Sequence, residues 1–221
     1  MDRCVDSNYL KSDFQNSNVE RIQALANILL VLAEFFKFPE EDFFHALKTG
    51  ELDEQIRELS LLAGCPSPLI ACFQNEIASY EELVDAYNTC LLGVRTPFAP
   101  PIESVYKVWT MDASYRGSLK HQTGYLMGDS SQHVRHILDV LGLEIPREYA
   151  LIPDHLAIIL EILAYLIMHG LLEEAEQFKT DHLDWLPEFQ NVLSQLDGSQ
   201  LYIRVLQTLE IVLADNFLEI N

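Results

Sequence analysis

Residues 153 to 166 read PDHLAIILEILAYL, in which a proline, an acid and a histidine precede an almost wholly apolar run. The apolar residues recur at intervals of three and four, which is typical of a buried helix. Proline suits the first helical position, and an acid near a helix N-terminus meets the positive end of the helix dipole. We therefore expect a core helix that begins at Pro153 and Asp154 and runs to Gly170.

The same spacing of apolar residues continues on both sides of this segment, and no stretch alternates between apolar and polar residues as a strand does. The sequence therefore predicts an all-α fold. Glycines supply left-handed caps at several predicted helix ends. The other predicted helices span residues 18–38, 40–49, 51–63, 79–92, 129–141, 171–180, 186–196 and 200–217, with a short one after Pro66 and Pro68.

The strongest break in the pattern is GVRTPFAPPIESVYKVW, residues 93 to 109, which has three prolines within five residues. The backbone there is not helical, because proline lacks the amide hydrogen and restricts the preceding residue. We predict an N-terminal helical lobe at 1–92, joined by this loop to a C-terminal lobe within 93–221, or one continuous domain. Loops 93–103 and 142–152 are candidate hinges, so a monomer and a domain-swapped homodimer both stay open.

Composition limits the classes of partner. The 34 acids and 14 bases give a formal charge of −20, and such a surface repels phosphate backbones and anionic lipid. No stretch has the length of apolar sequence that a membrane span needs, and the first residues lack the pattern of a secretory signal. We expect a cytoplasmic protein that binds no nucleic acid and does not insert into membranes.

Catalytic readings have weak support. One candidate is a catalytic group in which His155 is the base, Asp154 or Glu161 orients it, and Ser104 is the nucleophile. Adjacent helical residues point about 100° apart, so Asp154 is badly placed to hydrogen-bond His155. His133 and His136 have metal-ligand spacing but fit a solvated helix face better, and no phosphate-binding glycine motif occurs. We expect no enzyme activity and no cofactor, and keep an α-helical metal-dependent phosphohydrolase or nucleotide-binding protein as the alternative.

A binding surface is the better interpretation. Several aromatic and apolar side chains lie in or beside the stiff proline loop, where little conformational freedom is lost on association. These residues are Tyr87, Phe98, Ile102, Tyr106 and Trp109.

Two stretches together resemble a known family: PPIESVY, residues 100 to 106, and PDHLAIILEILAYL some fifty residues later. They resemble the paired signatures of the TorD/DmsD family of redox-enzyme maturation chaperones, which is related to NarJ. GDSSQHVRHILDVLGL, residues 128 to 143, and FKTDHLDWLPEF, residues 178 to 189, extend the similarity to roughly residues 80–189.

The resemblance implies a TorD-like bundle of helices that acts as a cytoplasmic, non-catalytic chaperone. Its partners would be the twin-arginine signal peptide and the apo form of a molybdopterin-containing oxidoreductase, held for cofactor insertion before export. The family's peptide-binding positions map onto Pro101, Ile102, Glu103, Ser104, Tyr106, Pro153, Asp154 and His155, and less closely onto Tyr87 and Leu91.

The resemblance also predicts which residues would bind the two arginines of the peptide. An acidic rim containing Asp154 and Glu103 would meet the two guanidinium groups, and an aromatic groove would take the apolar run that follows them. Ile102 and Ile162 replace aromatic residues found in some relatives, so the choice of client could differ. A protein that binds only the folded body of a redox enzyme is a further possibility.

Overall fold

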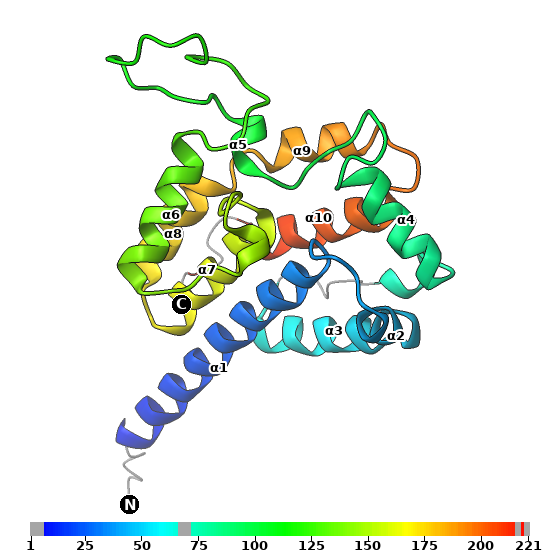
Figure 1. Cartoon of the computed structure of the whole chain (residues 1–221). Coiled ribbons are helices and arrows are strands. Elements are labelled where there is room, and N and C mark those ends of the chain that lie inside the picture. Colours follow the sequence, from blue (N-terminus) through cyan, green and yellow to red (C-terminus); the bar gives the residue numbers. More distant parts are fainter. Residues whose placement is uncertain (1–6, 66–71, 215–217, 219–221) are drawn as a thin grey trace, which may run out of the picture.

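The computed structural model describes residues 7–65, 72–214 and 218, with side chains from residue 18 onward. All regular elements in these ranges are helical, as the sequence predicts (Figure 1). The longer helices are α1 (Ser7–Glu34), α2 (Glu41–Thr49), α3 (Glu51–Ala63), α4 (Tyr80–Cys90), α6 (Asp129–Leu141), α7 (Leu156–Met168), α8 (Leu172–His182), α9 (Leu186–Leu193) and α10 (Gln200–Val212). Single turns are η1 (Phe73–Asn75), α5 (Glu103–Tyr106) and η2 (Arg147–Tyr149).

The core is built around α1 and α7, which pack along each other. Helix α7 is apolar on nearly all sides because other helices surround it, whereas α1 buries one face that includes Leu25, Ile28 and Leu29. One hydrophobic cluster contains residues from both predicted lobes, from Ala24 to Leu218. The division at residue 92 stays a prediction.

Several helix ends follow the sequence signals. Helix α3 has the predicted bounds, and Gly50 and Gly64 flank it in the left-handed conformation. Ser79 caps α4, since its hydroxyl accepts a hydrogen bond from the Glu82 amide at 3.2 Å. Helix α1 begins eleven residues earlier than predicted, at Ser7 instead of Asn18, and stops at Glu34 before Pro39.

Two predicted elements reach outside the described residues. The short helix expected after Pro66 and Pro68 would begin within residues 66–71, which are not described. The predicted end of the last helix at Phe217 is likewise outside the described part, and α10 ends at Val212.

The predicted start of the central helix is wrong. Helix α7 begins at Leu156, and His155 is its N-cap. Pro153 and Asp154 do not form a first helical turn: they lie in a tight turn in which the His155 amide donates to the Ile152 carbonyl at 3.0 Å, and His155 forms an isolated antiparallel bridge with Ile102. This pairing between distant segments overrides the local preference for a helix start.

Residues 107–128 form a loop that projects from the body between α5 and α6 (Figure 1). Its base is closed by backbone hydrogen bonds, in which the amides of Gly124 and Asp129 donate to Val105 and Trp109. The Trp109 indole also donates to the Leu126 carbonyl at 3.1 Å. The loop is therefore anchored at its base, and its tip is open to solvent.

Among the helices described, none combines the length and the apolar character that a crossing of the bilayer demands.

Candidate functional site

The two sequence signatures lie side by side. The Leu156 amide donates to the Pro101 carbonyl at 2.8 Å, and the Glu103 amide donates to the Asp154 carbonyl at 3.1 Å. Residues 101–104 and 154–156, which we call the seam, therefore form one unit although about fifty residues separate them. The seam fixes the proline loop against the N-terminus of α7.

The carboxylate of Asp154 faces inward. Asp154 has an exposed fraction of 0%, and its Oδ2 accepts a hydrogen bond from the Ser104 amide at 2.7 Å. A charged acceptor on a buried amide stabilises the start of α5 and holds the seam closed. Asp154 is thus placed as a structural link within the seam.

Glu103 is also fully buried, and its charge is met inside the protein. Its Oε2 lies 2.7 Å from His182 Nδ1, and its Oε1 lies 2.9 Å from Lys107 Nζ. The expected acidic rim of Asp154 and Glu103 is therefore wrong, because both side chains are buried against internal partners. Helix α8 is tied to the proline loop through the contact between His182 and Glu103.

His155 acts as a helix cap. Its Nδ1 accepts a hydrogen bond from the Ala157 amide at 3.2 Å, and its ring lies 4.9 Å from that of Tyr149. Burial, with a smaller contribution from the charge of Lys37, lowers the pKa of His155 to about 3. The imidazole is therefore neutral at physiological pH, which suits its role as an acceptor.

The structure does not arrange Asp154, His155 and Ser104 as a nucleophile with its base. Asp154 bonds the backbone of Ser104, and the Nδ1 of His155 is used by the helix cap. Ser104 Oγ is buried, and within the described ranges no group hydrogen-bonds it. The same ranges contain no group of three or more His, Cys, Asp or Glu side chains able to hold a metal ion.

A cavity of about 670 Å³ opens beside the seam. Its walls come from the seam, the C-terminal end of α4, the proline loop, the base of the projecting loop and η2, and the apolar side chains among them form most of its surface. The lining residues are Phe38, Tyr87, Leu91, Leu92, Phe98, Pro100, Pro101, Ile102, Val105, Gly124, Leu126, Glu148, Tyr149, Ile152 and His155. We call this space the apolar cavity, and its size is that of a typical ligand site.

Half of the predicted peptide-binding residues line the apolar cavity, namely Tyr87, Leu91, Pro101, Ile102 and His155. The other half lie outside its lining: Pro153, Asp154, Glu103, Ser104 and Tyr106. Of these, Tyr106 stacks on Trp185 with ring centroids 5.1 Å apart, and burial raises the pKa of its hydroxyl. The structure thus brings the predicted residues together, some as cavity wall and some as its frame.

A second cavity, of about 490 Å³, adjoins the first and shares Phe38, Glu148 and Tyr149 with it. Its lining contains four carboxylates and one ammonium group, and we call it the acidic cavity. The charged residues are Glu34, Lys37, Glu40, Glu148 and Glu161.

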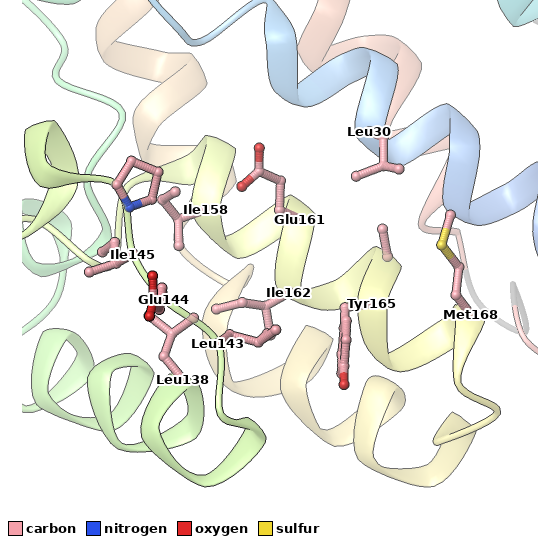
Figure 2. A pocket seen from close by; sticks show the side chains of 12 residues that line it. Leu30, Leu138, Leu143, Glu144, Ile145, Ile158, Glu161, Ile162, Tyr165 and Met168 are labelled. Atoms are coloured by element: carbon pink, nitrogen blue, oxygen red, sulfur yellow. The ribbon is translucent and has the colours of Figure 1, made fainter.

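A third cavity, of about 320 Å³, shares Pro146, Ile158 and Glu161 with the acidic cavity. It is mainly apolar and lies between α7, α1 and the segment 143–146. Figure 2 shows the Glu161 carboxylate directed away from Leu143 and Ile162 in this cavity. Neighbouring cavities share lining residues, with the acidic cavity between the two apolar ones, and we call the three together the groove.

Sequence reasoning missed most of the charged part of this groove; Glu161, which lies in the second signature, is the exception. Phe38 and Lys37 follow α1, and Glu148 and Tyr149 lie in the loop before the seam, so none belongs to the quoted signatures. Phe38 carried one local signal, since it is a large aromatic at a proline-terminated helix end and is 55% exposed. Its edge-on contact with Tyr87, with centroids 5.5 Å apart, depends on tertiary packing.

Comparison with known proteins identifies the family. The family model described as nitrate reductase delta subunit matches residues 48–197, about two thirds of the chain. No curated protein matches the sequence. The matched range contains both signatures and the seam that joins them. The chain therefore belongs to the nitrate reductase delta subunit family, the NarJ- and TorD-type chaperones of molybdoenzyme maturation.

Proposed function

We propose that this chaperone binds the twin-arginine signal peptide of a molybdopterin-containing oxidoreductase in the cytoplasm. It holds the apoenzyme until the cofactor has been inserted, and so delays export. It acts by binding alone, without catalysis.

One observation supports the proposal: the apolar cavity and the acidic cavity are neighbours that share Phe38, Glu148 and Tyr149 in their walls. A twin-arginine leader has two guanidinium groups followed by an apolar run. Carboxylates receive guanidinium groups in a bidentate manner, and aromatic walls take an apolar segment. The groove offers both surfaces, side by side, to one extended peptide.

The two parts of the groove would control different steps of binding. A net charge of −20 attracts a cationic leader over a distance and speeds its capture, in a manner that salt weakens. The apolar contacts, once formed, set how slowly the peptide leaves. In the proposed site, the charge therefore controls how fast the leader is captured, and the apolar contacts control how long it stays bound.

The test is a calorimetric titration with twin-arginine leaders of redox enzymes encoded near this protein's own gene. Matched leaders carry Lys-Lys or Gln-Gln in place of Arg-Arg. We expect micromolar or tighter binding of one Arg-Arg leader and weaker binding of both controls. If no leader binds, the signal-peptide proposal is wrong, and the body of the client becomes the partner to test.

A further inference from the structure

The acidic cavity already holds a cation. Lys37 Nζ lies 2.6 Å from Glu34 Oε1 and 2.6 Å from Glu161 Oε1. Glu34 ends α1, and Glu161 lies in the middle of α7, so the ammonium group joins the two central helices across the cavity.

The environment of Lys37 keeps it charged. Burial alone would lower the pKa of its ammonium group, but the hydrogen bonds and charges of Glu161 and Glu34 outweigh this effect, and the pKa is raised. Lys37 therefore neutralises part of the cavity in the absence of a ligand. The cavity keeps an excess of carboxylates, since Glu40 and Glu148 also line it.

This ion pair is also open to exchange. The Lys37 side chain is 28% exposed and that of Glu161 is 34% exposed, so both are within reach of an incoming group. Lysine has a flexible stem and forms single-point contacts, whereas arginine presents a planar fork that matches a carboxylate with two hydrogen bonds. A guanidinium group is thus well suited to replace this ammonium group.

We propose that Lys37 is an internal competitor that the arginines of a bound leader displace from Glu161 and Glu34. This inference rests on the proposed function. In the free protein Lys37 occupies the cation site, and the leader binds only to the fraction of molecules in which Lys37 has moved out. The apparent dissociation constant is larger than the intrinsic one by the inverse of that fraction. Lys37 therefore lowers affinity for the leader and returns to the carboxylates when the leader departs.

The experiment measures leader binding to Lys37→Met, which keeps most of the apolar stem and removes the charge. We expect the Arg-Arg leader to bind about three- to tenfold more tightly, since two partly exposed ion pairs no longer compete. The affinity for the Gln-Gln leader should be unchanged. Arg57→Gln is the matched control, because it removes one exposed positive charge from α3, away from the cavities.

Each outcome decides the proposal. Tighter binding that is confined to the cationic leader, and absent in Arg57→Gln, supports it. Unchanged or weaker binding of the Arg-Arg leader by Lys37→Met overturns it, provided that thermal unfolding shows a folded variant. If Lys37→Met does not fold, Lys37→Arg is used: its stronger hold on the carboxylates should weaken the Arg-Arg leader, and no weakening overturns the proposal.

Failure of the proposed function would give a different binding result from failure of the competitor role of Lys37. In that case wild-type protein binds neither the Arg-Arg nor the Gln-Gln leader. If instead wild-type protein binds the Arg-Arg leader and the Lys37 variants bind it equally well, the proposed function is retained and only the competitor role of Lys37 is lost.

Discussion

Two sets of carboxylates lie close together in this molecule and differ in what surrounds them. Asp154 and Glu103 in the seam are fully buried: one oxygen of Asp154 accepts from the Ser104 amide, and Glu103 lies against His182 and Lys107. Glu148 and Glu34 line the acidic cavity and are exposed. The difference teaches that residues carrying a family resemblance need not be those that line a cavity. Here Asp154 and Glu103 build the frame of the groove, whereas Glu161 of the second signature lines the acidic cavity together with Glu34, Glu40 and Glu148, which lie outside the signatures.

The largest effect that would test this contrast is on stability. Glu103→Ala should lower the free energy of unfolding by about 3 kcal/mol, because it leaves buried His182 without this partner and removes one of the two carboxylates that hold Lys107. Glu148→Ala is the matched control and should change stability by no more than about 0.5 kcal/mol. Urea unfolding of both variants measures the difference. Equal midpoints would mean that Glu103 does not hold the frame together.

A smaller effect concerns the pH dependence of the seam. His155 has a pKa of about 3 in the folded protein, below its value in the unfolded chain, so unfolding takes up a proton as the pH falls. Its contribution to stability is complete above about pH 6.5 and is lost progressively below it, by an amount of order 1 to 2 kcal/mol at pH 5.

His155→Asn separates this titration from the helix cap, because asparagine also caps helices well and has no charge to gain. We expect the variant to lose less stability than wild type between pH 7 and pH 5, as followed by thermal unfolding. His45→Asn, at an exposed position of α2, is the matched control for the loss of one histidine. A wild-type pH slope in His155→Asn would contradict the buried neutral imidazole.

The smallest effect is on binding. Glu148→Gln should weaken the Arg-Arg leader about two- to fivefold, which is the scale of one partly exposed ion pair, and should not alter the free energy of unfolding measurably. The Gln-Gln leader should bind both proteins equally. Glu54→Gln, which removes an exposed carboxylate of α3, accounts for the loss of long-range attraction. Equal weakening by both variants would mean that Glu148 acts only through net charge.

Local signals predicted the helices well wherever the chain itself ends them. Gly50, Gly64 and Gly142 adopt positive φ, and the bounds of α3 and α6 follow from them. The start of α7 was missed because the pairing of Ile102 with His155 links segments far apart in sequence. No local pattern contains that information.

The candidate site was predictable to the same degree. The signatures indicated part of the apolar wall, including Pro101, Ile102 and His155, and the family resemblance added Tyr87 on the preceding helix. The orientation of Asp154 and Glu103 was not predictable, because the sequence pattern is the same whether an acidic side chain faces water or a buried amide. The position of Lys37 depends on how α1 packs against α7, which spacing alone does not give.

The anchored base of the projecting loop has a consequence for how members of such a family can diverge. Leu126 and Gly124 lie at this base and in the wall of the apolar cavity, while the tip around residues 113–121 touches no cavity described above. Lengthening a flexible tip costs only about 0.6 kcal/mol for each doubling of its length. Insertions there are cheap for folding, whereas single substitutions at the base reshape the cavity. The length of the tip and the shape of the apolar cavity can therefore change independently of each other.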